Sequence, residues 1–408
     1  MGTIGVRRLA AHPDQLAEIS AEVFSARLVL ATVAAAMMAV AALVAIPDPA
    51  ARTLTLLYGA ALLALPAAQA WLFQGTGRIG TTAVVQNVRM GAFALGVALF
   101  VTNAARTVWV GWFELGSVVV SGAWALGQQR RWITPVRFAW DPARLWGLVR
   151  ESAPVGLSHV VWAVNQYLPS LLVATILGLS AAAPFSAAHR VFVSLVTFAW
   201  IYHFNLFPIL ARLTKESPVA LREMVTDSFR FCSWAGILGA VLVTLLATPI
   251  LTLLFGPEFA SAGPAFAVMV WTVPLLLLSD HPRWVLVAAG WERAVVLIQA
   301  VGVVITLAAG ALLIRRFGVV GGAGSIVVAN LVVAALLFRL AWRQLGWMPI
   351  RPVLLPAALA AVLVAGSAML DLQPYASAAI ATLVFTIAGV ATEPELLPAL
   401  RRLGSARG

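Results

Sequence analysis

Apolar stretches of about twenty residues recur along this chain from Arg27 almost to its C-terminus. A helix rises about 1.5 Å per residue, so each stretch is long enough to cross a hydrocarbon core of roughly 30 Å. The 408 residues are 62% hydrophobic and 11% charged, whereas a soluble domain carries about 25% charged residues. Stretches such as 28–43 and 353–364 are apolar on all sides and lack the alternation of a transmembrane β-strand. The sequence therefore predicts an all-α, polytopic membrane bundle.

The bundle is predicted to contain twelve spans: 27–46, 54–73, 82–102, 106–126, 154–177, 184–210, 229–254, 264–289, 294–314, 319–338, 353–370 and 376–392. If the N-terminus is cytoplasmic, most basic residues fall on inner segments. Only four fall on outer segments: Arg52, Arg106, Arg315 and Arg316. Cytoplasmic loops carry the excess of Lys and Arg in membrane proteins. We therefore expect both termini in the cytoplasm and interpret the net charge of +11 as an orienting coat.

Five regions follow from these spans. They are an interfacial N-terminal segment (1–26), an N-terminal lobe of four spans (27–126), a basic connector (127–153), a C-terminal lobe of six spans (154–342), and an accessory hairpin with a cytoplasmic tail (343–408). The connector holds Trp132, Trp140 and Trp146 among its arginines, which favours a membrane-anchored connector over a nucleic-acid platform. Cys232 is the only cysteine, so neither an intramolecular disulfide nor a structural zinc site is expected.

The chain also contains a weak internal repeat. An offset of 205 residues aligns the segment before span one with the segment before span seven, matching Pro13 with Pro218 and Phe24 with Phe229. Spans two and eight both lead into a glycine-led turn, 75–78 and 290–293. Spans one to four then pair with spans seven to ten as a parallel repeat, a layout used by two-lobed transporters. In this register we expect the first hairpin of a fourteen-helix design to be missing, either because the start codon is misassigned or because the protein is shortened.

Four segments carry a resemblance to a known family: 70–75 (AWLFQG), 207–213 (FPILARL), 254–262 (LFGPEFASA) and 318–323 (GVVGGA). Taken in this order, they resemble the bacterial polysaccharide (O-antigen-type) flippases of the multidrug/oligosaccharidyl-lipid/polysaccharide (MOP) exporter superfamily. The resemblance implies a two-lobed transporter of the bacterial cytoplasmic (inner) membrane. Such a transporter moves lipid-pyrophosphate-linked oligosaccharide to the outer leaflet by alternating access, through a cavity lined by cations.

The resemblance also sets the expected partners. They are the lipid-linked oligosaccharide, membrane lipids and other membrane proteins of polysaccharide assembly, and no nucleic acid is expected. A transporter of this kind is not an enzyme, so we expect no catalytic residue, no cofactor and no metal ion. Because the family's first two helices help to line the cavity, their absence from the predicted spans bears directly on the activity of the chain.

Arginines inside the spans are the main candidates for substrate binding. An arginine in the middle of a bilayer costs roughly 2.5–3.5 kcal/mol, so it faces a cavity or a partner. Guanidinium groups also pair with phosphate oxygens in bidentate geometry. The candidates are Arg89 with Gln86 in span three, Arg190 with His189, Ser186, Ser194 and Thr197 in span six, and Arg283 with Asp280 in span eight. The topology predicts Arg190 toward the outer side and the other two arginines toward the inner side.

Each of these arginines has a structural alternative. Arg89 and Arg190 would snorkel to the interface or cap a packed helix contact. Arg283 would be neutralised by Asp280, three residues away on the same helix.

Other polar residues in the spans are weaker candidates. His159 and Gln166 of span five would bind sugar hydroxyls or join helices by hydrogen bonds. Tyr202 and His203, near the inner end of span six, fit an interfacial belt equally well. Glu114 in the outer half of span four is the candidate for ion coupling.

Two other functions compete with the flippase. A multidrug (MATE-like) cation antiporter requires carboxylates inside the bundle, where this chain has an excess of arginine. A membrane-embedded enzyme acting on polysaccharide requires paired acids or an acid with a histidine at the membrane surface. The acids on the outer segments, Asp48, Glu258 and Asp371, are isolated in the sequence.

Overall fold

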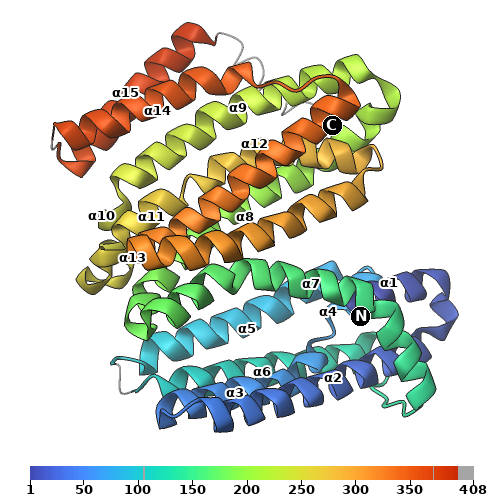
Figure 1. The fold of residues 1–408 in the computed structure, drawn as a ribbon. Helices are drawn as coiled ribbons and strands as arrows, with labels where there is room; N and C mark the ends of the chain where they lie inside the picture. The colour runs from blue at the N-terminus through green and yellow to red at the C-terminus, as the bar shows by residue number, and fades with distance from the viewer. Residues whose placement is uncertain (104–105, 371, 394–408) are drawn as a thin grey trace. The chain divides into compact units, whose positions relative to one another are not determined.

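The computed structural model describes residues 1–103, 106–370 and 372–393, apart from the side chains of some helix residues within them (Figure 1). This part of the chain is built of helices and contains no strand, which confirms the predicted all-α class. It forms two compact units, Met1–Val161 (unit 1) and Trp162–Gly408 (unit 2). The boundary between them falls within one long helix, α7 (Pro142–Leu177). The lobe boundaries predicted from the sequence stay predictions.

Ten helical segments of the described chain are long and apolar enough to cross a membrane. Two features account for the difference from the twelve predicted spans. Residues 292–345 are counted once, although they include the predicted spans nine and ten. In span five, the described apolar helix is limited to Gln166–Leu177, which is shorter than a full crossing. The chain is therefore a multi-pass membrane protein.

Unit 1 contains α1 (Gly2–Ala11), α2 (Leu16–Ala45), α3 (Pro49–Ala64), α4 (Ala70–Gly75), α5 (Ile79–Phe100), α6 (Val108–Trp132) and the first part of α7. In its membrane part, α6 packs against both α3 and α5. Glycines allow the close approach of α6: a Cβ added at Gly111 would lie 2.9 Å from the Cβ of Leu57, and one at Gly122 would lie 2.9 Å from the Cβ of Ala67. Small residues at such positions let membrane helices pack closely.

The predicted second span, 54–73, is not one continuous helix. A short 3-10 turn, Leu65–Ala68, and Gln69 separate α3 from α4. Gln69 has φ 47°, a left-handed backbone conformation that is uncommon for a residue with a side chain. The break lets α4 turn back toward the N-terminal helix α1, against which it packs.

Ion pairs join the N-terminal segment and the connector of unit 1, which the sequence predicts on the same inner side. Arg8 of α1 donates from Nε to Glu151 of α7 at 3.0 Å, and Arg144 of α7 pairs with Glu18 of α2. The Arg8 guanidinium holds the pKa of the Glu151 carboxyl below its usual value. Hydrogen bonds from Arg144 to Glu18 raise the pKa of Arg144. These contacts bring the N-terminal segment and the connector together, as a common side of the membrane requires.

Unit 2 contains the rest of α7, α8 (Leu179–Glu216), α9 (Pro218–Leu245), α10 (Ala247–Phe255), α11 (Gly263–Met269), α12 (Thr272–Ala288), α13 (Glu292–Leu345), α14 (Arg351–Met369) and α15 (Pro374–Thr392). Its largest core cluster includes Phe185 of α8, Phe266 of α11 and Ile314 of α13, all fully buried. The hairpin α14–α15 packs on α9, where Trp234 and Phe385 stand edge to face at 5.9 Å.

The α13 element is two helices that meet at a glycine. Gly318 has φ 59° and ψ −138°, a combination that strongly favours glycine, so the chain reverses between the predicted spans nine and ten. A Cβ added at Gly321 would lie 2.0 Å from the carbonyl oxygen of Leu313, so only glycine allows the two helices to approach so closely there. The glycine-rich segment 318–323 therefore builds a tight helical hairpin.

The two predicted repeat copies share a turn geometry. After α4, Gly77 has φ 73° and the amide of Arg78 donates to the carbonyl of Phe73 at 2.7 Å. After α12, Gly290 has φ 86° and the amide of Trp291 donates to the carbonyl of Leu286 at 2.9 Å. Both are helix ends of the Schellman type. The equivalent glycines are thus Gly77 and Gly290, so the sequence pairing of Gly75 with Gly290 is wrong by two residues.

Candidate substrate-binding site

In unit 1 the candidate Arg89 is paired with a carboxylate. Its Nη2 donates to Oε1 of Glu114 on the neighbouring helix α6, and both side chains are largely buried, with 27% and 14% exposed. Arg89 is the eleventh of the 22 residues of α5, so the pair lies near the middle of that helix. The charged groups of the two residues therefore meet, although the sequence predicts Arg89 toward the inner side and Glu114 in the outer half of its span.

This pairing changes what the two residues can do. A carboxylate that compensates an arginine is not free to bind a coupling ion, and the arginine is not free to bind phosphate without first breaking the pair. The Nε of Arg89 is buried and has no hydrogen-bond partner in the described structure. Gln86, one turn earlier on α5, is exposed. We therefore interpret Arg89–Glu114 mainly as an interhelical contact.

In unit 2 the neighbours His189 and Arg190 face different surroundings. The ring of His189 is 7% exposed and lies between Phe185 at 6.2 Å and Phe192 at 5.6 Å, measured between ring centroids. Arg190 is exposed. Successive helix residues are rotated by about 100°, so adjacency in sequence does not place the two side chains together. The expectation that His189 lines the same surface as Arg190 is wrong.

In the described part of the chain, the guanidinium of Arg190 has no partner, unlike that of Arg89. None of the described residues forms a hydrogen bond or ion pair with its guanidinium. Two hydroxyls of the predicted polar stripe beside Arg190 are used within the helix itself. The hydroxyl of Ser194 donates to the carbonyl of Arg190 at 3.1 Å, and that of Thr197 donates to the carbonyl of Val193 at 2.9 Å. The hydroxyl oxygens keep only acceptor capacity for a ligand. Arg190 is thus an uncompensated cation on a helix that is long and apolar enough to span the membrane.

The candidates of span five, His159 and Gln166, stay predictions. Gln166 of α7 is half-buried. The side chain of His159 lies outside the described part of the chain, as does Asp371 of the outer segments.

The third arginine is neutralised within its own helix. Nη1 of Arg283 donates to Oδ1 of Asp280 at 2.8 Å, and the guanidinium stands 5.0 Å from the ring centroid of Trp284. The alternative drawn from their spacing, that Asp280 neutralises Arg283, is therefore confirmed. Asp280 itself is 5% exposed. Its carboxylate is therefore placed to pair with Arg283 and is hardly accessible to solvent or to a ligand.

A buried polar network adjoins this pair, and the sequence does not show it. The ring nitrogens of His203 and His281 are 3.4 Å apart, and the hydroxyl of Ser228 lies 2.6 Å from Nε2 of His281 and 2.6 Å from the hydroxyl of Tyr202. The network joins α8, α9 and α12. The sequence signal that could have indicated this network is the presence of polar residues near the predicted inner ends of spans six, seven and eight. Tyr202 and His203 thus belong to an internal network rather than to an interfacial belt.

A family model described as "Polysaccharide biosynthesis protein" matches residues 2–214 of the chain, more than half of its length. No curated protein sequence matches the chain.

Two solved structures show what the fold is similar to. The lipid II flippase MurJ in an inward closed conformation matches with a TM-score of 0.77 at 10% sequence identity, over 97% of this chain and 88% of that chain. An outward-facing MATE-family multidrug resistance transporter of the MOP superfamily matches with a TM-score of 0.52 at 14% identity, over 85% of this chain and 81% of that chain. At such low identity the likeness is one of fold.

Proposed function

The chain belongs to the polysaccharide biosynthesis protein family, and on that premise we propose that it is a flippase for lipid-pyrophosphate-linked oligosaccharide. In this proposal it moves its substrate from the inner to the outer leaflet of the bacterial cytoplasmic membrane by alternating access, for the synthesis of a surface polysaccharide. The likeness of its fold to those of a lipid II flippase and a MATE-family transporter, together with its multi-pass helices, supports a transporter. Both termini face the cytoplasm in this proposal, as the distribution of basic residues predicts.

The observation that carries the proposal is the uncompensated Arg190. A cation inside an apolar span is costly unless something compensates its charge, and the described structure holds no carboxylate against this one. A substrate with a pyrophosphate group supplies the missing negative charge. A guanidinium is suited to it because its fork of N–H donors matches two phosphate oxygens. Arg190 would thus replace part of the hydration that the pyrophosphate loses inside the membrane.

The competing cation antiporter finds less support. A carboxylate that binds an organic cation must be available to it, whereas Glu114 compensates Arg89 and Asp280 compensates Arg283. Among the described residues of unit 2, the unpaired charge on the apolar span of α8 is that of Arg190, which is positive and suits an anionic substrate. This contrast favours the flippase although the fold is also similar to that of a MATE transporter.

The proposal is tested by complementation in the organism that carries the gene. Deletion should leave lipid-linked repeat units on the cytoplasmic face and abolish the surface polysaccharide, and the wild-type gene should restore it. Arg190→Ala should fail to restore it at an equal membrane level on immunoblots. Arg212→Ala is the matched control, because Arg212 lies on the same helix, is exposed, and forms an ion pair with Glu216 at 3.7 Å. Unchanged polysaccharide on deletion, or full complementation by Arg190→Ala, contradicts the proposal.

A further inference from the structure

The four arginines on the predicted outer segments are used in two different ways. Arg52 donates from Nε to the carbonyl of Ile46 at 3.0 Å, and Arg106 donates from Nη1 to the carbonyl of Phe100 at 3.2 Å. Both therefore cap the carbonyl end of a preceding helix. Arg315 and Arg316 have no hydrogen bond or ion pair with any described residue, and both are exposed. These two adjacent cations lie on the predicted outer side, where arginine is rare, and no contact with a described residue explains their presence.

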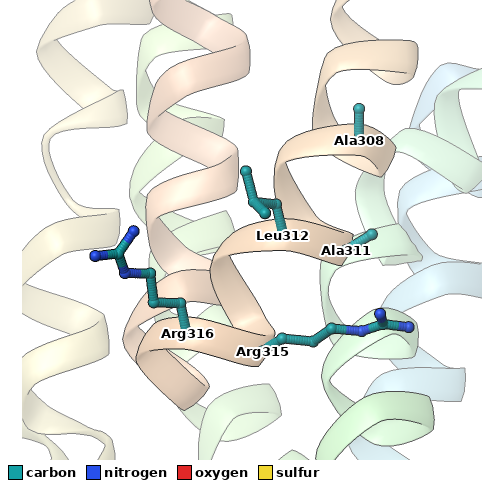
Figure 2. A pocket seen from close by; sticks show the side chains of 5 residues that line it. All are labelled: Ala308, Ala311, Leu312, Arg315 and Arg316. Atoms are coloured by element: carbon teal, nitrogen blue, oxygen red, sulfur yellow. The ribbon is translucent and has the colours of Figure 1, made fainter.

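Arg315 and Arg316 stand at the end of an apolar stripe. With Ala308, Ala311 and Leu312 they line an open hollow of about 550 Å³ (Figure 2). The five positions follow the spacing i, i+3, i+4, i+7 and i+8, which places them along one face of the first helix of α13. The figure shows Arg315 and Arg316 extending to opposite edges of that face, with Leu312 above them. The small side chains of the two alanines leave the room for the hollow.

The chemistry of this face is that of an amphiphile with an anionic head. The alanines and Leu312 offer apolar surface to an alkyl or prenyl chain, and the two guanidiniums offer donors to phosphate oxygens. The arginines lie at the end of the helix that the topology predicts to be outer, three and two residues before the reversal at Gly318. The ring of Phe317, 5.6 Å from the guanidinium of Arg316, adds apolar surface at the same end.

We propose that the hollow lined by Ala308, Ala311, Leu312, Arg315 and Arg316 is a second binding site for the lipid pyrophosphate, at the outer end of α13. Its occupant is the pyrophosphate with the first units of its prenyl chain, held after translocation and before release into the outer leaflet. The choice of this ligand rests on the proposed function. The site is distinct from Arg190, which belongs to α8.

The site is tested by equilibrium binding, which does not require transport. The full chain in phosphatidylcholine nanodiscs is titrated with geranylgeranyl pyrophosphate, with protein-free nanodiscs as the reference. R315Q/R316Q should weaken binding about tenfold or more, because it removes the charge-assisted donors. Ala311→Trp, which fills the hollow and keeps the charge, should weaken binding as well. R52Q/R106Q, which makes the same charge change on the same predicted side, should leave binding within about twofold of the wild type.

Three results would overturn the site. The first is an equal loss of binding in R315Q/R316Q and R52Q/R106Q, which would indicate general electrostatics. The second is binding of inorganic pyrophosphate as tight as that of the prenyl compound, which would mean that the apolar stripe is unused. The third is full competition by an equal concentration of phosphatidylglycerol, which would identify a phospholipid site. The same binding series in an Arg190→Ala background separates this site from the proposed function. Both are supported if Arg190→Ala lowers flipping and if R315Q/R316Q still weakens binding in that background.

Discussion

Two arginines of the spans, Arg89 in unit 1 and Arg190 in unit 2, are used in opposite ways. In unit 1, Arg89 of α5 is compensated by Glu114 of α6, and the pair adds no net charge to the helices that carry it. In unit 2, Arg190 of α8 is exposed and meets no carboxylate among the described residues. The same residue type in an apolar helix is thus a packing contact at Arg89 and an open charge at Arg190. The difference teaches that an intramembrane arginine indicates a binding site only when its partner is missing.

The largest expected effect is on the compensated pair. Glu114→Gln leaves the charge of Arg89 without a partner, and we expect the free energy of unfolding in detergent to fall by about 2–3 kcal/mol, somewhat less than for a fully buried pair. The double variant R89Q/E114Q removes both charges and should recover most of the loss. If the double variant is no more stable than Glu114→Gln alone, the pair is not the contact described here.

A smaller effect is expected at the turns that the two units share. Gly77→Ala and Gly290→Ala each force a side chain into a left-handed backbone conformation, which should cost about 1 kcal/mol at either position. An added Cβ meets no atom within 4 Å at either glycine, so the cost is that of the backbone alone. Gly80→Ala is the control, because Gly80 is equally open but helical. A cost at one turn and none at the other would break the equivalence of the two turns.

The ion pairs of unit 1 predict a still smaller, pH-dependent effect. The pKa of Glu151 is lowered in the folded protein by Arg8, so this stabilisation is present above the unfolded pKa of about 4.3 and is lost as the pH falls through the folded value. Because the side chains are partly exposed, the effect should stay under about 1 kcal/mol. Thermal unfolding between pH 3 and pH 7 measures it, and Glu151→Gln should remove that part of the slope. An unchanged slope in Glu151→Gln would show that other carboxyls carry the dependence.

The smallest effect on stability is expected at the open charge of unit 2. Arg190→Gln removes no hydrogen bond or ion pair to a described residue, so the free energy of unfolding should change by no more than about 0.5 kcal/mol. Its unfolding midpoint, measured beside that of Glu114→Gln, shows whether the two arginines differ as described. A loss as large as that of Glu114→Gln would mean that Arg190 is a structural contact too.

Much of the fold follows from the sequence because single helices follow from local patterns. The apolar runs place the helices, and the glycines of 318–323 place the reversal within α13. The pair of Asp280 with Arg283 is also local, since residues three apart face each other on a helix. The interrupted span at Gln69 and the shifted turn at Gly77 depend on backbone angles that the apolar pattern does not contain.

The candidate site was less predictable because it depends on contacts between helices. Glu114 reaches Arg89 from another helix, and no spacing in the sequence reveals that register. His189 was grouped with Arg190 because the two are adjacent, although the rotation of the helix buries one and exposes the other. The contact of His203 with His281 joins residues 78 positions apart. The partners that decide whether a polar side chain is free thus come from packing.

The most direct test of this account is a flipping assay in proteoliposomes that contain the full chain and a lipid-pyrophosphate-linked saccharide from its own organism. Two variants carry the comparison: Arg190→Ala and R89Q/E114Q. The account predicts that Arg190→Ala lowers the flipping rate about tenfold or more, because the pyrophosphate loses a charge-assisted partner, while R89Q/E114Q retains most of the activity. A fully active Arg190→Ala together with an inactive R89Q/E114Q would contradict it.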